Sequence, residues 1–272
     1  MLKSGEKNTM IVKSGKPFVR EGNEHHAIAI GEGGVAIPPG PNGEFTTKPF
    51  QDFFDLFDVD RPLAWARLAD SPGQLAEKLI PYLKGTSSGF FIEAGANNGV
   101  FQSNTIFLEE CFNWTGILVE PNLRAFELCK KMRLRSKVIN CALVDSEDIK
   151  EVEGYFCDIN SDLSLTGKIS SSEDEDNKRK KTKVKASTLN RILKDNDIEN
   201  NIDFLSLDTE GYELNILNGL DFNRWAPKLI CVESYDPKKF FKIKQKLASH
   251  GYAFIARLTK GDFLFKHISS NN

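Results

Sequence analysis

The sequence predicts an α/β fold built around a mostly parallel sheet, and three observations lead to this prediction. From about residue 72, short apolar runs alternate with segments of helical periodicity, which is the arrangement of βαβ units. Several of the apolar runs end directly in acidic or small polar residues, as buried strands do where they open into loops. The 272 residues are enough for one large domain with an appendage or for two small domains.

The expected elements follow one another at short intervals along this regular part. The expected strands cover residues 90–92, 116–119, 138–143, 204–207 and 229–232, and a terminal hairpin joins residues 254–256 to 263–265. The expected helices cover residues 75–83, 100–111, 125–132, 189–193 and 212–220, and a last one begins near Phe240 and ends at Gly251. Asn122 is the expected N-cap of the helix that follows it. His250 is expected to cap the last helix.

Residues 1–71 form an irregular N-terminal extension in this prediction, and residues 72–272 form the main domain. The extension contains turn-forming runs and then an aromatic cluster, Phe50, Phe53, Phe54, Leu56 and Phe57. Docking of this cluster on the main domain is the preferred interpretation. A lid over a substrate cleft, or a contact between copies in a homo-oligomer, is the alternative. His25 and His26 have no partner at metal-ligand spacing.

A charged loop insertion is expected at about residues 168–183. Acidic residues at 173–176 immediately precede a basic cluster at 178–181 and cancel its field. A solvated loop is therefore favoured over a phosphate-binding patch.

Composition and charge favour a cytoplasmic protein that binds neither nucleic acid nor membranes. There are 36 basic and 38 acidic residues, a net charge of −2, so no global field attracts the chain to polyanions. The five cysteines show no closely spaced pair, which indicates free thiols. The start of the chain lacks a signal-peptide core, and no apolar stretch approaches the length of a membrane span.

Carboxylates cluster after two of the expected strands. Asp208 and Glu210 follow residues 204–207, and Glu233 ends the next strand. Such acids are costly to bury unless they are paired, hydrogen-bonded or bound to a cation. Because ligands bind outside the carboxyl ends of strands in open α/β sheets, these three are the candidate catalytic residues. Together they are candidate ligands of Mg²⁺ or a similar cation, or else Asp208 or Glu210 acts as a plain general base. An acid-rich helix start is the alternative for the first two.

Three further strand ends carry groups suited to a nucleoside. The loop Glu93–Gly99 has two glycines spaced Gly-x-x-x-Gly, which does not meet the dinucleotide fingerprint of three. This spacing, with an acid before the first glycine, suits a nucleoside ligand without a pyrophosphate. Glu120 ends the second strand, where an acid can accept the hydroxyl protons of a ribose. Cys141 and Ala142 are small enough to edge a flat base.

Three motifs in this order resemble those of the FkbM family of methyltransferases. They are residues 91–99 together with Ser103-Asn104-Thr105, residues 116–122, and residues 208–213. The resemblance covers residues 72–266 approximately. It implies a Rossmann-like class I methyltransferase sandwich with a seven-stranded, mostly parallel sheet and a C-terminal antiparallel hairpin. It also implies S-adenosylmethionine as cofactor and O-methylation of a hydroxyl group on a sugar, glycan or other small molecule.

The resemblance assigns cofactor contacts residue by residue. Glu93, Gly95 and the loop after them would hold the methionine part, Glu120 the ribose, and Asn122 with Cys141 and Ala142 the adenine. The full implied set is Glu93, Gly95, Ala96, Asn97, Gly99, Ser103, Asn104, Glu120, Pro121, Asn122, Cys141 and Ala142.

Two other functions remain open from the sequence. A non-catalytic binding or scaffold protein could retain this fold, although Asp208, Glu210 and Glu233 argue against it. A nucleotide-dependent oxidoreductase is the third hypothesis, and the missing third glycine argues against that one.

Overall fold

The structure is a computed structural model that describes residues 66, 69, 74–157, 179–199 and 201–269, together with the backbone of short strands between residues 10 and 48 and at 167–169. Side chains are described for residues 66, 69, 74–154, 181–199 and 201–269. The predicted aromatic cluster at residues 50–57, the histidine pair and the acidic run at 173–176 lie outside these ranges.

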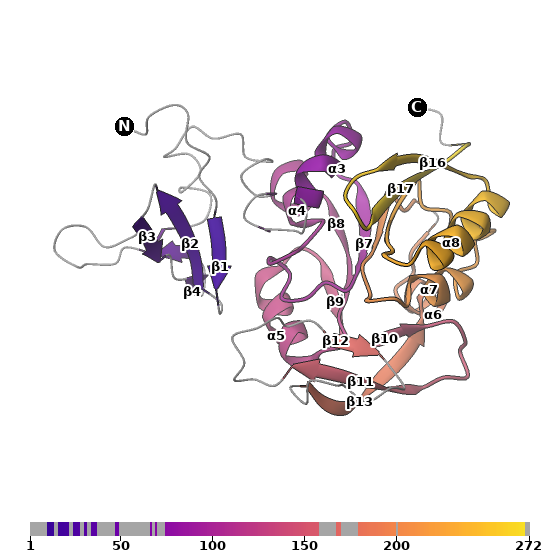
Figure 1. Cartoon of the computed structure of the whole chain (residues 1–272), viewed down its shortest axis with the longest axis horizontal. Helices are drawn as coiled ribbons and strands as arrows, with labels where there is room; N and C mark the ends of the chain where they lie inside the picture. Colours follow the sequence, from indigo (N-terminus) through magenta and orange to yellow (C-terminus); the bar gives the residue numbers. More distant parts are fainter. Residues whose placement is uncertain are drawn as a thin grey trace.

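A seven-stranded sheet in the order β16-β17-β15-β14-β7-β8-β9 forms the centre of the domain (Figure 1). Its strands are β7 (Phe90–Ala94), β8 (Thr115–Val119), β9 (Lys137–Ile139), β14 (Phe204–Leu207), β15 (Leu229–Glu233), β16 (Tyr252–Arg257) and β17 (Asp262–His267). The five strands from β9 to β15 pair in parallel, whereas β17 pairs antiparallel with both β15 and β16. The predicted mostly parallel sheet with a C-terminal hairpin is confirmed.

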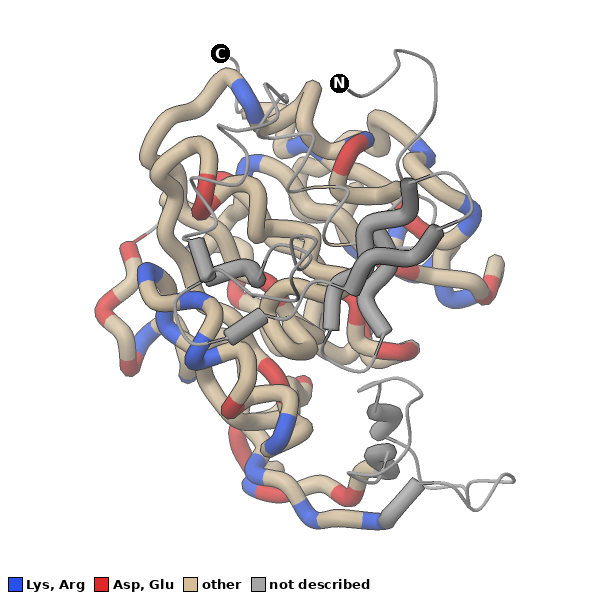
Figure 2. Tube along the Cα trace, turned by 90° about the vertical axis from the view of Figure 1, so that its left-hand side faces the viewer, with Lys and Arg blue, Asp and Glu red and all other residues tan. Residues whose placement is uncertain are grey.

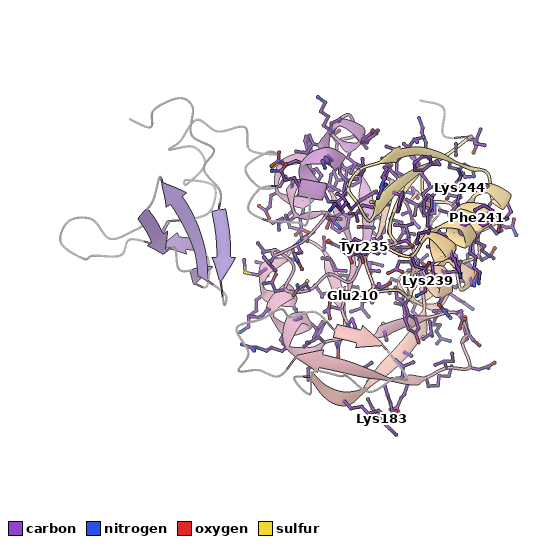
Figure 3. All side chains as sticks on the ribbon, in the orientation of Figure 1. Lys183, Glu210, Tyr235, Lys239, Phe241 and Lys244 are labelled. Atoms are coloured by element: carbon purple, nitrogen blue, oxygen red, sulfur yellow. The ribbon has the colours of Figure 1, made fainter. Side chains whose placement is uncertain are left out.

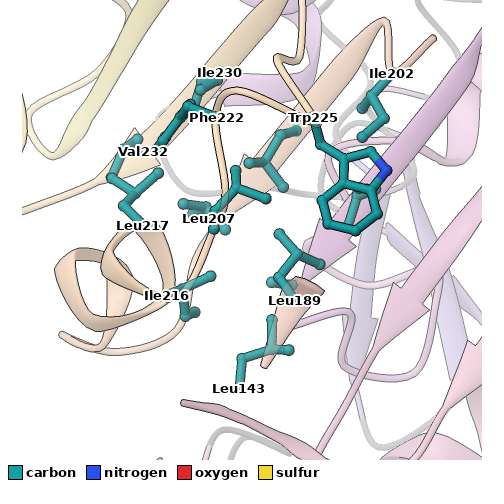
Figure 4. Close-up of a cluster of buried hydrophobic side chains, with 14 of the residues drawn as sticks. Leu143, Leu189, Ile202, Leu207, Ile216, Leu217, Phe222, Trp225, Ile230 and Val232 are labelled. Carbon is teal, nitrogen blue, oxygen red and sulfur yellow. The ribbon is translucent and has the colours of Figure 1, made fainter. Parts of the chain in front are cut away.

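Helices cover both faces of this sheet. Since successive residues of each strand point to opposite sides, they pack into two different cores. The helices are α3 (Leu75–Leu83), α4 (Ile106–Phe112), α5 (Leu123–Met132), α6 (Leu189–Asp195), α7 (Glu213–Asn218) and α8 (Pro237–Ser249). On β7, Phe91 packs into a core with α3, α4 and α5 residues, and the next residue, Ile92, packs into a second core with α6, α7 and α8. Figure 4 shows part of the second core, where Trp225 is buried among leucines and isoleucines.

The predicted strand at 138–143 is in fact two strands in two different sheets. β9 ends at Ile139, and β10 (Ala142–Val144) begins a second sheet in the order β10-β13-β11-β12. Asn140 separates them, since its amide donates to the carbonyl oxygens of Glu120 and Pro121 at 2.8 and 3.0 Å. The chain therefore bends away from β8 at this point.

The second sheet corrects the predicted loop at residues 168–169 and 179–183, which are strand, whereas residues 170–178 lie outside the described ranges. Its other strands are β11 (Glu151–Cys157), β12 (Gly167–Ile169) and β13 (Arg179–Thr188). Glu153 lies opposite Lys183 in the β11–β13 register and forms an ion pair with Lys181 at 2.7 Å. Opposite charges on paired strands favour a ladder over a loop, so residues 179–183 are strand.

α4 begins six residues later than the predicted helix start at residue 100. The side chain of Asn98 accepts hydrogen bonds from the amides of Val100 and Phe101, and Gln102 has a left-handed φ of 60°. Both features hold this segment in turns. The residues before α4 therefore form a long loop over the end of β7.

The N-terminal region pairs its backbone where the sequence predicts irregular structure. One antiparallel sheet contains β1 (Met10–Lys13), β2 (Lys16–Glu21) and β3 (Glu24–Ala27), and another contains β4 (Ile30–Gly31), β5 (Gly34–Ala36) and β6 (Thr47–Lys48). The domain boundary at residue 71 stays a prediction. In the part of the chain that the structure describes, none of the helices combines the length and apolar character needed to cross a bilayer.

Candidate functional site

The carboxyl ends of β7, β8, β14 and β15 open onto one cleft. The chain runs from β7 to β9 on one side and from β14 to β15 on the other, so the strand order reverses between β7 and β14. Such a switch point is where open α/β sheets bind ligands. The open space of the cleft is about 900 Å³ including its mouth.

Nine predicted site residues line this cleft, and they come from distant parts of the chain. They are Gly95, Asn97, Glu120, Pro121, Cys141, Ala142, Asp208, Glu210 and Glu233. The lining residues that sequence reasoning missed are Ala94, Gln102, Val119, Leu143, Thr209, Tyr212 and Ile216. Most of the missed residues adjoin a predicted one in sequence, so including the last residue of each strand would have found several of them.

Gly95 follows β7 and lies close to the ends of both neighbouring strands, β8 and β14. Its amide donates to Val119 O of β8 at 3.0 Å, and the amide of Asp208 donates to Ala94 O at 3.1 Å. A Cβ at Gly95 would overlap the carbonyl oxygen of Asp208, and its φ of 84° is left-handed. No other residue fits here without moving the backbone.

Glu120 ties the loops on either side of the cleft together. It is buried, and its two carboxyl oxygens accept hydrogen bonds from the amides of Asn97 and Asn122, each at 2.8 Å. Burial raises the pKa of Glu120 to about 7, and the two amide donors lower it only partly. A donor from a ligand that stabilised the charged form would lower the pKa further.

Cys141 and Ala142 form a small, apolar wall next to Glu120. Both side chains are buried, and burial raises the pKa of the Cys141 thiol to about 12. The thiol is therefore neutral at physiological pH and acts as a small apolar group. This wall adjoins Leu143 of β10, which packs into the second core.

The acids at the ends of β14 and β15 form a hydrogen-bonded pair. Burial and the charge of Glu233 raise the pKa of Asp208 well above its ordinary value. Burial also raises the pKa of Glu233 to about 7, while a hydrogen bond from Asp208 lowers it. Asp208 is therefore the protonated partner that donates to the Glu233 carboxylate. A carboxylate with a pKa near 7 is suited to accept a proton at neutral pH.

The loop that carries Asp208 and Glu210 is held in shape by its own residues. Glu213 is buried, and its Oε1 accepts from the amide and hydroxyl of Thr209 and from the amide of Gly211 at 2.9–3.0 Å. Lys239 of α8 donates to the carbonyl oxygen of Gly211 at 3.1 Å (Figure 3). These contacts give Glu213 a structural role, since it holds the loop that carries the two acids.

Tyr235 follows the end of β15 by two residues and is labelled in Figure 3. Its side chain is 64% exposed, and its ring packs so closely on Gly261 that a Cβ there would come within 2.6 Å of the ring. Tyr235 also shares a hydrogen bond with Glu233. An aromatic surface therefore lies directly beside the paired acids.

The remaining predicted residues are placed behind the cleft lining. Glu93, Ser103 and Asn104 are buried, and the Glu93 carboxyl group accepts hydrogen bonds from Ser103 Oγ and from the amide of Asn104. Asn122 caps α5 by accepting from the amides of Arg124 and Ala125. Ala96 and Gly99 lie in the loop after β7 but do not line the cleft. The cofactor roles assigned to these six residues stay predictions.

The charge of the cleft is negative. Its lining contains Glu120, Asp208, Glu210 and Glu233, and no Lys, Arg or His occurs among the described residues that line it. Within the described ranges, no group of three or more His, Cys, Asp or Glu side chains is arranged to hold a metal ion. The predicted alternative in which the three strand-end acids bind Mg²⁺ therefore has no support in their arrangement.

Basic and acidic segments are interspersed over the side of the molecule shown in Figure 2. The cleft is thus distinguished by its chemistry from that face.

Three solved structures illustrate the similarity to known folds. The methyltransferase FkbM of Methylobacillus flagellatus KT is 13% identical with a TM-score of 0.43, and the alignment covers 66% of this chain but only 43% of that one. A putative S-adenosyl-L-methionine-dependent methyltransferase of Methanococcus maripaludis is 9% identical, with a TM-score of 0.43 and coverage of 82% and 93%. A precorrin-6y C5,15-methyltransferase of Geobacter metallireducens GS-15 is 11% identical, with a TM-score of 0.40 and coverage of 71% and 85%.

Because these TM-scores lie below 0.5, the family assignment depends on the sequence match instead. A search of curated proteins found none that matches this chain. The sequence model of the family described as "Methyltransferase FkbM domain" matches residues 93–254. This range is more than half of the chain and includes the residues that line the cleft. The chain belongs to the FkbM methyltransferase domain family.

Proposed function

We propose that this protein is an S-adenosylmethionine-dependent O-methyltransferase that acts on a hydroxyl group of a sugar, glycan or other small molecule. The observation that carries the proposal is the convergence of Gly95, Glu120 and Asp208 on one cleft, from the ends of three different strands. The alternative of a dispersed arrangement would have left no common site.

The cleft has the chemistry that this cofactor needs. Its lining includes four carboxyl groups and no basic side chain among the described residues, which favours a cationic sulfonium and disfavours a pyrophosphate. The Glu120 carboxylate is placed to accept hydroxyl protons of a ribose, since each of its oxygens accepts only one hydrogen bond within the protein. The buried wall of Cys141 and Ala142 leaves room for a flat base.

The residues of the loop after β7 bind the methionine part in this proposal. Gly95 and Asn97 bring backbone close to the cleft, and both have left-handed φ angles, of 84° and 50°. Strained or left-handed residues at such a site are typical of backbone shaped for ligand binding. The bound cofactor would supply a methyl group on a positively charged sulfur, and the neutral thioether of S-adenosylhomocysteine would be the leaving group.

The paired acids Asp208 and Glu233 remove the proton of the acceptor hydroxyl group. As the hydroxyl oxygen bonds to the methyl carbon, its proton must pass to a base, and the Glu233 carboxylate is the proposed base. Asp208 donates a hydrogen bond to Glu233 and stabilises its charged form before the transfer. Alignment of the donor and the acceptor further lowers the activation barrier, because the displacement requires the attacking oxygen, the methyl carbon and the sulfur to lie in line.

Calorimetry with S-adenosylhomocysteine tests the proposal. The intact chain should bind it, and Glu120→Ala should weaken binding at least about tenfold, since one hydrogen bond to a charged group contributes about 1.5–3 kcal/mol. Glu127→Ala, an exposed position on α5, is the matched control and should bind as the wild type does. Absence of binding to the wild type, or equal affinity of the Glu120→Ala variant, would refute the cofactor assignment.

Transfer itself is tested with radiolabelled methyl donor and a panel of sugars and glycans. Label should appear in the acceptor and resist mild base, as an ether does. Binding of the cofactor without transfer to any acceptor would favour the alternative of a non-catalytic protein with this fold.

A further inference from the structure

Arg133 is a fully buried arginine at the end of α5 that no sequence motif identifies. Its side chain is 0% exposed, and its guanidinium donates to four different groups. Nε donates to Glu109 Oε2 at 3.0 Å, Nη1 to Gly99 O and Ser103 Oγ, each at 3.1 Å, and Nη2 to Thr105 Oγ1 at 3.0 Å. Three of these four acceptors belong to the loop between β7 and α4.

Glu93 holds the same loop from the other side. Its carboxyl group accepts from Ser103 Oγ at 3.0 Å, from Thr105 Oγ1 at 2.5 Å and from the amide of Asn104 at 2.6 Å. It also lies 3.5 Å from Arg133 Nη1. The carboxyl and guanidinium groups thus share Ser103 and Thr105 as common partners.

The loop has one face on this network and the other on the cleft. Asn97 and Gln102 line the cleft, and the amide of Asn97 donates to Glu120. Between them, Gly99 presents its carbonyl oxygen to Arg133. A Cβ at Gly99 would lie 2.7 Å from Arg133 Cγ, so glycine at this position makes room for the arginine stem.

The charges of the network require the arginine. Glu93 and Glu109 are both buried, and Arg133 is the cation within salt-bridge distance of each. Removing one partner of a buried ion pair leaves the others without a counter-charge, which costs more than the pair contributes. The network therefore has one stable arrangement, with the loop drawn onto the guanidinium.

We propose that Arg133 is a positioning residue that fixes the loop of residues 95–105 in its cofactor-binding form. Glu93, Ser103 and Thr105 act through Arg133 and do not touch the cofactor. This inference rests on the proposed function, because the loop is taken to bind the methionine part. Glu93 and Ser103, which the family resemblance assigns to contact with the cofactor, instead support the loop that binds it.

Amide hydrogen exchange of the free protein gives the first test. Arg133→Lys retains a charge but loses the planar fork that reaches four acceptors at once. Exchange within residues 95–105 should accelerate at least tenfold in this variant. Arg135→Lys is the matched control, because Arg135 donates to the carbonyl oxygen of Glu109 at 2.8 Å but to no residue of the loop. Equal exchange of the loop in the wild type and Arg133→Lys would overturn the proposal.

Affinity for S-adenosylhomocysteine gives the second test, through a double-mutant cycle of Arg133→Lys and Ser103→Ala. If the serine acts through the arginine, each change should raise the dissociation constant about tenfold, and the double variant should be little worse than either. Additive effects would mean that Ser103 contacts the cofactor directly, and would overturn the proposal. Failure of the wild type to bind would refute the proposed function alone, since the exchange experiment judges the loop without any ligand.

Discussion

Glu120 makes the stability of this fold depend on pH in a way that one substitution can isolate. Its carboxyl group is buried between two loops and has a pKa of about 7, compared with 4.5 for an unperturbed glutamic acid. Burial disfavours the charged form more than the amides of Asn97 and Asn122 favour it. Glu120→Gln removes this titration and keeps the size of the side chain.

The direction of the effect follows from proton binding. Between pH 4.5 and 7 the folded protein holds the Glu120 proton while the unfolded chain has lost it, so this contribution to stability is present below pH 4.5 and is lost as pH rises through 7. A difference of 2.5 pKa units (7 − 4.5) corresponds to about 3 kcal/mol, at about 1.36 kcal/mol per unit. Relative to the wild type, Glu120→Gln should therefore gain about 3 kcal/mol between pH 4.5 and pH 8.

Urea unfolding of both proteins across this pH range measures the difference. The other buried acids change the stability of both proteins equally, so they cancel in the comparison. Any constant cost of the lost hydrogen bond also leaves the slope unchanged. Glu127→Gln, at an exposed position, should give a flat difference curve. A flat curve for Glu120→Gln as well would refute the assignment of a raised pKa to this residue.

Other substitutions probe the cleft and the elements around it. Gly95→Ala should abolish binding of S-adenosylhomocysteine by calorimetry, because its Cβ overlaps the Asp208 carbonyl and the left-handed backbone alone costs about 1–2 kcal/mol; normal affinity would contradict the close crossing of strand ends. Asp208→Ala removes the donor to Glu233, so the Glu233 carboxyl should titrate above pH 7 in a ¹³C NMR experiment, and an unchanged or lower midpoint would exclude the paired acids. Asn122→Ala should lower the free energy of unfolding by about 1 kcal/mol in urea, since Asn122 caps α5, and a loss near zero would show that the cap is dispensable.

The parts of the fold that could be predicted are those whose signal is local. The run at residues 204–207 is apolar except for Ser206, and all four residues are buried, because β14 is a central parallel strand covered on both faces. The final hairpin is also visible, since its two aromatic runs are close in sequence. Asn122 and His250 were placed correctly at helix ends by the chemistry of capping.

The errors occur where a distant residue decides the local structure. The late start of α4 has a local cause in the turn at Asn98 and a distant one in Glu93, ten or more residues before Ser103 and Asn104, which donate to its carboxyl group. The strand at 138–143 is divided because the amide of Asn140 binds carbonyl groups beyond the end of β8. Neither contact leaves a periodic pattern in the sequence.

Within the site, the sequence predicts which residues gather near the cleft but not which of them line it. Glu93 and Glu120 both end or nearly end a strand and are equally buried, but only Glu120 lines the cleft. Glu93 is one residue before the end of β7, so its side chain points to the face opposite that of Ala94. On that face its carboxyl group lies 3.5 Å from Arg133 Nη1. In the β7–β8 register Glu93 lies opposite Leu118, so Glu120 lies two positions farther along, beyond the end of its strand, where it lines the cleft.

The charge of the cleft then limits which nucleosides the proposed function can use. A dinucleotide would bring a pyrophosphate next to Glu210 and the Glu233 carboxylate, and the described lining offers no basic group to offset the repulsion. A sulfonium experiences the opposite effect, and its charge lowers the pKa of the acids around it. Binding of S-adenosylmethionine at pH 7 should therefore release protons, whereas the uncharged sulfur of S-adenosylhomocysteine should release fewer. Calorimetry in buffers of different ionisation enthalpy measures this difference, and equal proton release by the two ligands would place the sulfur away from the acids.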